Sequence, residues 1–317
     1  MNTIDYTELL HRYPWLVQHN QNCILSPDVD GLLCGLFMSH YYGWNIAGYY
    51  DGKQLLLRNA VSPSDCVFLD MEIYRNDIRS IGQHMVLYNS RDIPQSWGRF
   101  DNCINPNNIR GFDANKHFAQ KYPFGTIHLL LALIRHTREV GIRADAITVL
   151  LYVDGTFKNL LNYPENCISW LNFLDAKNES SPLSSMLNIF AAQRISTMMH
   201  DLEKIFEEFR TIGGGKKGGD KIKLDGIDTE FSAEQLAQTE NLLGYLATLT
   251  GWHYTPGEWS FTNLVHTRFE KGIIPIGKLN NRSFNEVLDQ NPVSFAITGT
   301  KQIEYTLPGS HGIFSRV

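Results

Sequence analysis

Short apolar runs that each lead to an aspartate are the feature that most constrains the fold of this chain. The runs span residues 23–25, 67–69 and 147–153, and the aspartates that follow them are Asp28, Asp70 and Asp154. Each run is long enough for a buried strand, and stretches with helical periodicity separate them. This alternation favours an α/β fold with a mostly parallel sheet and helices on both faces. In such sheets ligands bind beyond the carboxyl ends of the strands, which is where these aspartates are expected.

The turn after the first run carries a second carboxylate. Asp28-Val29-Asp30-Gly31 leads from a predicted strand into a helix that is expected to start near Asp30. Two carboxylates two residues apart on such a turn can face one point, and hard divalent cations prefer oxygen ligands. Asp28 taken alone also fits a helix N-cap, which is a common position for Asp. Asp70 and Asp154 are expected at the same edge of the sheet. With them, the metal-site interpretation is as well supported as the helix-capping interpretation.

Composition describes a folded chain with no overall basic surface. Hydrophobic residues make up 43% of the 317 residues and charged residues 19%, with a formal net charge of −5. A negative net charge favours a small nucleotide or short oligomer over duplex nucleic acid as the ligand. The five cysteines are far apart and form no Cys-x-x-Cys pair, which favours a reducing compartment. The polar, acidic start of the chain and the absence of an apolar run of about 20 residues predict a cytoplasmic protein that does not bind membranes.

We expect three parts along the chain: a catalytic domain over residues 1–177, a linker region over 178–230, and an accessory domain over 231–317. The first part is predicted to contain helices over 6–19, 118–140 and 164–174, and further strands over 45–50 and 78–81. The linker region is predicted to contain one amphipathic connector helix over 183–209. Ser232 and Gln235 form a capping-box pattern at the start of a helix over 232–250. Short β-like runs over 261–267, 293–298 and 303–307 predict a second, smaller α/β domain.

A glycine- and lysine-rich loop occupies residues 212–221 in the linker region. It lacks the Ser or Thr of a phosphate-binding Walker loop and follows a predicted helix instead of a strand. A solvated, mobile loop is the favoured interpretation. The alternative is a basic flap that contacts substrate phosphates.

The ordered motifs of residues 20–175 resemble the DHH phosphoesterase superfamily, which includes RecJ-like exonucleases and nanoRNases. The matching segments are Asp28-Val29-Asp30-Gly31, Asp70, Gln83-His84-Met85 at the place of Asp-His-His, Asn105-Pro106, Gly125-Thr126 and Asp154. The resemblance implies two divalent cations, Mn²⁺ or Mg²⁺, that share Asp70. It assigns Asp30, Asp154 and His84 to one cation and Asp28 to the other. Gln83 and Met85 depart from the motif, and the upstream ligand position of the second cation is Ile24 or Ser26, so that second site is expected to be weakened.

The resemblance implies a metal-dependent phosphoesterase that hydrolyses phosphodiester or phosphoanhydride bonds in short single-stranded oligonucleotides or small nucleotides. Asp28 and His84 are the expected catalytic residues. The candidate substrate contacts are Asn105, Arg110, Lys116, His117 and His311, where surface charge is the favoured alternative for Arg110, Lys116 and His117. The competing hypothesis is a catalytically attenuated relative that binds a nucleotide or a partner. A homodimer is a further expected assembly.

Overall fold

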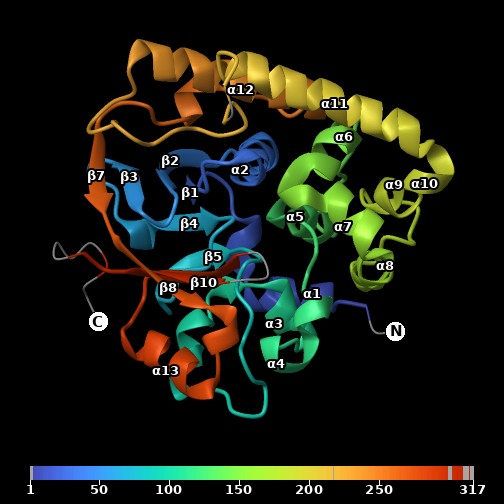
Figure 1. The fold of residues 1–317 in the computed structure, drawn as a ribbon. Helices are drawn as coiled ribbons and strands as arrows, with labels where there is room; N and C mark the ends of the chain where they lie inside the picture. The colour runs from blue at the N-terminus through green and yellow to red at the C-terminus, as the bar shows by residue number, and fades with distance from the viewer. Residues whose placement is uncertain (1–2, 217, 299–301, 310–313, 315–317) are drawn as a thin grey trace.

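The computed structural model describes residues 3–216, 218–298, 302–309 and 314. Over these residues the protein is α/β, with a mixed seven-stranded sheet and a small antiparallel sheet (Figure 1). The order in the main sheet is β6 (Cys103–Ile104), β5 (Arg79–Ile81), β4 (Cys66–Leu69), β1 (Asn22–Leu25), β2 (Asn45–Tyr50), β3 (Gln54–Arg58) and β7 (Leu264–Arg268). The neighbours from β6 to β2 pair in parallel, whereas β3 and β7 pair antiparallel. The prediction of a mostly parallel sheet flanked by helices is therefore confirmed.

Helices pack against this sheet and against one another. In the first half of the chain they are α1 (Tyr6–Arg12), α2 (Val29–Tyr42), α3 (Pro106–Arg110), α4 (Ala114–His117), α5 (Thr126–Ile134) and α6 (Ala144–Tyr152). In the second half they are α7 (Thr156–Asn162), α8 (Pro164–Phe173), α9 (Ser184–Leu187), α10 (Ile189–Ala192), α11 (Ile195–Ile212), α12 (Ala233–Thr250) and α13 (Asn281–Asp289). Helices α11 and α12 lie side by side and cover α6 and α2 (Figure 1).

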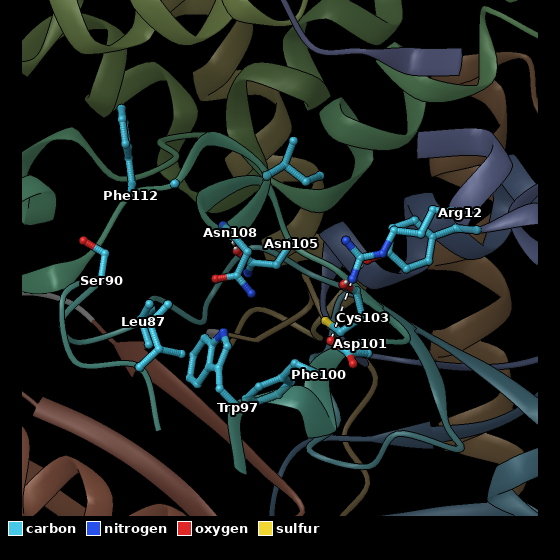
Figure 2. A pocket seen from close by; sticks show the side chains of 14 residues that line it. Arg12, Leu87, Ser90, Trp97, Phe100, Asp101, Cys103, Asn105, Asn108 and Phe112 are labelled. Carbon is cyan, nitrogen blue, oxygen red and sulfur yellow. Dashed lines mark hydrogen bonds and ion pairs between the residues drawn. The ribbon is translucent and has the colours of Figure 1, made fainter. Parts of the chain in front are cut away.

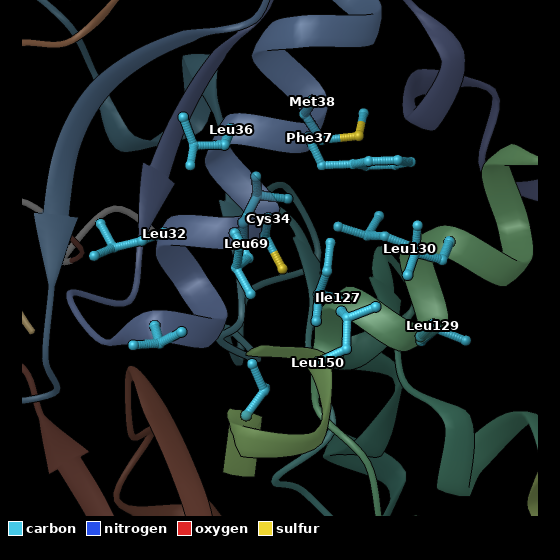
Figure 3. Packing of buried hydrophobic residues seen from close by; sticks show 14 of the residues in the cluster. Leu32, Cys34, Leu36, Phe37, Met38, Leu69, Ile127, Leu129, Leu130 and Leu150 are labelled. Atoms are coloured by element: carbon cyan, nitrogen blue, oxygen red, sulfur yellow. The ribbon is translucent and has the colours of Figure 1, made fainter. Parts of the chain in front are cut away.

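Helix α2 is the centre of the hydrophobic core. Leu32, Leu36 and Phe37 are fully buried, and α2 packs against the sheet on one side and α5 on another. Figure 3 shows Leu69 of β4 and Leu130 of α5 in the same cluster. A helix that is apolar on all sides needs such burial on all sides. This packing holds the N-terminus of α2, which follows Asp28, at a fixed position on the sheet edge.

The small sheet has the order β8 (Glu270–Pro275), β10 (Gln302–Leu307) and β9 (Ser294–Thr298). It docks on the main sheet through polar contacts. Tyr50 and Ser294 share a hydroxyl–hydroxyl hydrogen bond of 2.8 Å, and the hydroxyl of Thr306 donates to the carbonyl of Gly52 at 2.7 Å. The carboxyl edge of the main sheet therefore faces the small sheet.

One predicted strand is wrong. Residues 147–153 were expected to form a strand that ends at Asp154, but they belong to α6 and the 3₁₀ turn Val153–Gly155. Ala146, Val149, Leu150 and Val153 are buried at helical spacing, so the run has the period of a helix instead of a strand. Length and composition alone do not separate a short buried strand from a buried helix.

Other predicted elements differ in their bounds. The connector helix expected over 183–209 is divided into α9, α10 and α11. Asn188 separates the first two, and the extended backbone of Gln193 and Arg194 separates α10 from α11. The helix expected over 118–140 runs only over α5, after Pro123 and Gly125. Strands β3 and β8 and helix α13 were not predicted. The capping box of Ser232 and Gln235 is confirmed at the start of α12.

The three-part division of the chain stays a prediction, and β7 of the third part hydrogen-bonds to β3 of the first. The five cysteines are buried and free. No helix within the described part of the chain combines the length and apolarity needed to cross a membrane.

Candidate metal centre

The order of the strands creates a crevice at the end of β1. From β1 the chain passes to β2 on one side and later returns to β4 on the other side. In an open parallel sheet, ligands bind at the carboxyl ends of the strands where the order reverses in this way. Asp28 follows β1 and Asp70 follows β4, so both aspartates lie at this reversal.

Three side chains from separate elements converge there. Asp70 follows β4, His84 follows β5, and Asp154 lies in the 3₁₀ turn after α6. One ligand atom from each of them lies within 4.8 Å of the others. Two carboxylates and an imidazole form a donor set that suits a divalent cation such as Mn²⁺. We call Asp70, His84 and Asp154 the carboxylate–histidine cluster.

Asp70 is buried with an unsatisfied oxygen. Its Oδ1 accepts a hydrogen bond from the hydroxyl of Thr126 at 2.7 Å. Its Oδ2 is buried and has no hydrogen-bond partner in the described structure. Burial and the nearby carboxylates of Asp30 and Asp28 raise the pKa of Asp70 well above its usual range. A cation would satisfy the orphaned oxygen and compensate the buried charge, so the residues present fit a bound metal.

The carboxylate of Glu72 lies next to the imidazole ring of His84, on the side away from Asp70. Its Nε2 lies 3.9 Å from Oδ1 of Asp70, and its Nδ1 lies 3.5 Å from Oε2 of Glu72. Burial lowers the pKa of His84, but the hydrogen bond and charge of Glu72 outweigh it and raise the pKa to about 9. Oε1 of Glu72 accepts from the Met85 backbone N–H at 2.9 Å and from Asn105 at 2.7 Å. Glu72 therefore orients the ring so that Nε2 faces Asp70.

Asp154 is the exposed member of the cluster. Its Oδ2 accepts a hydrogen bond from the Gln83 amide at 2.5 Å. Gln83 stands where the DHH resemblance expects an aspartate. The side chain at this position therefore touches a candidate ligand, although it is an amide and carries no charge.

The carboxylate of Asp30 caps the N-terminus of α5. Its Oδ2 accepts from the backbone N–H of Thr126 at 2.6 Å, and its Oδ1 accepts from that of Ile127 at 2.9 Å. A Cβ atom on Gly125 would lie 2.6 Å from Asp30 Oδ2, so this approach requires glycine. Burial, with the charges of Asp154 and Asp28, raises the pKa of Asp30 to about 8. The predicted ligand Asp30 thus caps a helix and is not one of the three cluster residues.

Asp28 is the N-cap of α2, as the alternative interpretation of the sequence proposed. Its Oδ1 accepts from the backbone N–H of Gly31 at 3.2 Å. The side chain is half-buried and also lines a cleft between the main sheet and the small sheet. Capping therefore leaves Asp28 at the edge of the site.

A cleft of about 290 Å³ separates these residues from the small sheet. Asp28, Asp70, Glu72 and His84 line one wall of the cleft. The other wall carries Lys271, Ser294, Phe295, Glu304 and Thr306. Lys271 is paired with Glu304 at 2.9 Å. Both sheets therefore contribute to one polar cleft of a size that can hold a small ligand.

The predicted substrate contacts lie elsewhere. Asn105 is fully buried and donates to Glu72 and to the carbonyl of Met85. Arg110 lies 4.4 Å from the ring centre of Trp170 and donates to Ser169. Lys116 is exposed on α4, and His117 stacks on Phe112. None of these four side chains is among the described residues that line the cleft. His311 lies outside the described residues.

A second cavity, of about 300 Å³, lies on the other side of Asn105. Figure 2 shows Trp97 and Phe100 next to each other at one side of this cavity and Arg12 facing Asp101 at another. Asn105 lines it and also bonds to Glu72, so the amide separates this cavity from the residues that hold His84.

Glu72 and Thr126 contact the cluster but are not among the residues that the sequence pattern predicts for the site. Glu72 lies two residues after Asp70, which repeats the spacing of Asp28 and Asp30, and this repeat was an available signal. Thr126 becomes relevant only because the start of α5 meets the end of β4. No family model, curated protein or solved structure matches this chain.

Proposed function

We propose that this protein is a divalent-metal-dependent phosphoesterase that hydrolyses phosphodiester or phosphoanhydride bonds of short single-stranded oligonucleotides or small nucleotides. The observation that carries the proposal is the convergence of Asp70, His84 and Asp154 within 4.8 Å. The orphaned Oδ2 of Asp70 and the position at the strand-order reversal add support.

The proposal also draws on the resemblance to the DHH phosphoesterase superfamily. Three of the four ligands that the resemblance assigns to one cation are the cluster residues. The fourth, Asp30, is occupied by backbone N–H groups of α5. A single cation held by Asp70, His84 and Asp154, either Mn²⁺ or Mg²⁺, is therefore the form of the site that we propose.

Each residue would have a distinct part in the reaction. A bound cation would polarise the phosphoryl oxygens and lower the pKa of a water molecule. Asp70 and Asp154 would hold it with their carboxylates, and Glu72 would keep His84 Nε2 directed at it. Thr126 holds Oδ1 of Asp70 and leaves Oδ2 for the ligand. The two walls of the cleft would exclude water from around the phosphate.

A second function is favoured by one observation. Gln83 donates to Asp154 at 2.5 Å and so competes with a cation for that oxygen. If this hydrogen bond persists, the cleft would bind a nucleotide or a partner without turnover, which is the attenuated alternative.

Metal binding and hydrolysis, measured together, test the proposal. We expect calorimetric titration with Mn²⁺ to show one site, and Mn²⁺ to support hydrolysis of bis(p-nitrophenyl) phosphate or short oligonucleotides. Asp70→Asn should abolish both, because it removes the charged oxygen that has no other partner. Asp145→Asn, which removes an exposed carboxylate on α6, is the matched control.

Two results would count against the enzyme. Absence of Mn²⁺ binding to the wild-type protein would contradict the proposed metal centre. Mn²⁺ binding without hydrolysis of any member of a panel of oligonucleotides, dinucleotides and pyrophosphate would instead support the binding module.

A further inference from the structure

A cavity of about 570 Å³ lies beside the metal centre, under the glycine- and lysine-rich loop that follows α11. Lysine side chains of this loop and the first turn of α12 line it. Its charged lining residues are Lys216, Lys221, Lys223, Asp225 and Glu234. We call this cavity the lysine pocket. It is separate from the cavity shown in Figure 2.

The loop that forms the pocket is tightly closed on the end of α11. A Cβ atom on Gly219 would lie 1.8 Å from the carbonyl oxygen of Phe209, so only glycine fits there. The hydroxyl of Tyr152 donates to Asp220 at 2.7 Å and ties the loop to α6. The pocket therefore has walls fixed by these contacts, whereas its lysine side chains are exposed, and the solvated, mobile loop stays a prediction.

The lysines of the pocket are unpaired and close together. Within the part of the chain that the structure describes, none of the three ammonium groups forms an ion pair with a carboxylate. A Cβ atom on Gly218 would lie 3.4 Å from Cε of Lys223 and 3.9 Å from Cε of Lys221. These two side chains therefore converge on one point.

Carboxylates reduce this positive charge but do not cancel it. Asp225 accepts a hydrogen bond from Gln54 at 3.3 Å, and Glu234 lies in the first turn of α12. Among the described residues of the lining, three lysines and two carboxylates leave one net positive charge. An anion is thus the favoured ligand, and unpaired lysines bind phosphate groups as point charges.

Lys221 connects the lysine pocket to the metal centre. It lines both the pocket and the cleft that contains Asp70 and His84. Its backbone pairs with that of Asp28, and the next N–H, from Ile222, donates to the carbonyl of Pro27 at 2.8 Å. The loop is therefore fixed to the same turn that leads into the candidate site.

We propose that the lysine pocket binds a second phosphate group of the substrate, beyond the one at the carboxylate–histidine cluster. This inference rests on the proposed phosphoesterase function and narrows its substrates to molecules with at least two phosphates. The cleft and the pocket share Lys221, and together they offer phosphate sites to the backbone of a single-stranded oligonucleotide. A short polyphosphate chain offers the same phosphate chemistry, and the experiment distinguishes the two sources.

The test uses the double variant Lys216→Gln/Lys223→Gln and the control Lys177→Gln, which removes an exposed lysine far along the chain from the loop. The probe is a fluorescein-labelled pentathymidylate with phosphorothioate linkages, followed by fluorescence anisotropy at several salt concentrations. We expect the double variant to bind about tenfold more weakly and its log Kd to depend less steeply on log salt, by about 1.4, since each contact contributes about 0.7 for single strands. The control should match the wild type.

Unlabelled tripolyphosphate identifies the source of the phosphate. Displacement by tripolyphosphate at concentrations where an unlabelled pentathymidylate fails would assign the pocket to a polyphosphate chain. Displacement by unlabelled pentathymidylate at concentrations where tripolyphosphate fails would assign the pocket to a nucleotide backbone. Thermal melting by circular dichroism checks that the variants are folded, as expected for exposed lysines.

Hydrolysis of bis(p-nitrophenyl) phosphate, which carries one phosphate, separates the two proposals. The double variant should keep this activity within twofold of the wild type. Equal oligonucleotide affinity and equal salt slope in the double variant and the wild type would overturn the lysine pocket, even with hydrolysis intact. If the double variant loses oligonucleotide affinity and the wild type does not hydrolyse any substrate, the proposed phosphate site in the lysine pocket is supported. Only the proposed phosphoesterase activity is then overturned.

Discussion

Asp70 and Asp154 both have positive φ angles, of 64° and 50°. Non-glycine residues rarely adopt this conformation, and Asp and Asn tolerate it best because their short side chains bond locally. Backbone strain of this kind is concentrated at functional sites. In this protein it turns two carboxylates from different elements toward one imidazole. The strained backbone is thus a second reason, besides proximity, to regard the cluster as functional.

At the same scale, Glu72→Gln should alter His84 without unfolding the protein. Glu72 supplies the charge that raises the pKa of His84, so its loss leaves burial to lower that pKa from about 9. We expect the metal-free variant to show a lower His84 pKa by NMR titration of the imidazole. We also expect about 10- to 100-fold weaker Mn²⁺ binding, the usual result of losing the partner of a ligating histidine.

A matched control is Glu8→Gln, which changes an exposed carboxylate on α1. An unchanged pKa of His84 in Glu72→Gln would show that Glu72 does not orient the ring.

At the scale of elements, the start of α5 holds the site together. Its first N–H groups bind Asp30, its Thr126 hydroxyl binds Asp70, and its His128 reaches α6. His128 Nδ1 accepts from the N–H of Gly125 at 3.1 Å, and Nε2 bonds to the carbonyl of Leu150 at 3.1 Å. Because α6 leads directly to Asp154, these bonds set the distance between Asp154 and the aspartates of the sheet.

Protonation of His128 is incompatible with this arrangement. Burial lowers its pKa to about 4, against 6.5 in the unfolded chain. The folded state therefore holds the neutral ring, and its contribution to stability is complete above pH 6.5. As the pH falls from 6.5 to about 4, the unfolded state takes up a proton that the folded state does not, and stability is lost.

We expect the free energy of unfolding to fall by about 3 kcal/mol over this range because of His128 alone, at about 1.4 kcal/mol for each pKa unit. Urea unfolding of wild type and His128→Gln at pH 7 and pH 4 measures it. The variant should be less stable at pH 7. Its free energy of unfolding should change less between the two pH values than that of the wild type, by about 3 kcal/mol. His200→Gln, on the exposed face of α11, should retain the wild-type pH dependence.

At the scale of the whole molecule, the site lies between two sheets. The main sheet supplies Asp28 and Asp70, and the small sheet supplies the opposite wall with Lys271 and Phe295. Arg75 is buried between them and donates to the carbonyls of Tyr74, Pro292 and Asn291, at 2.6, 2.7 and 3.2 Å. One side chain thus joins the loop after β4 to the chain segment that enters β9.

Arg75→Met should loosen the small sheet and leave the metal centre intact. The variant leaves buried carbonyls without donors, which costs about 2–4 kcal/mol. We expect faster hydrogen exchange in residues 281–298 and 302–307, an unchanged exchange rate in β1 and β4, and unchanged Mn²⁺ affinity. Hydrolysis should fall because the second wall of the cleft is displaced. Arg282→Met, which alters an exposed arginine of α13, is the control. Uniformly faster exchange over the whole chain would show that the two sheets form one cooperative unit.

The sequence by itself determined the features that depend on local pattern. The strands at Asn22–Leu25, Asn45–Tyr50 and Cys66–Leu69 follow from apolar runs bounded by turn residues, and the capping box of Ser232 follows from spacing alone. Asp70 could be selected as a candidate ligand because it ends such a run. Local signals of this kind need no knowledge of the partner segment.

Only the tertiary structure decided which of these candidates meet. The helical state of α6 depends on its burial against α11 and α12, and Asp30 became a cap because α5 starts beside it. Glu72 matters because His84 lies next to it, and the lysine pocket exists because the loop folds back onto Pro27 and Asp28. Each is a contact between residues far apart in the chain or on separate elements. A sequence pattern states what a residue can do, and the packing of the chain decides which atoms it reaches.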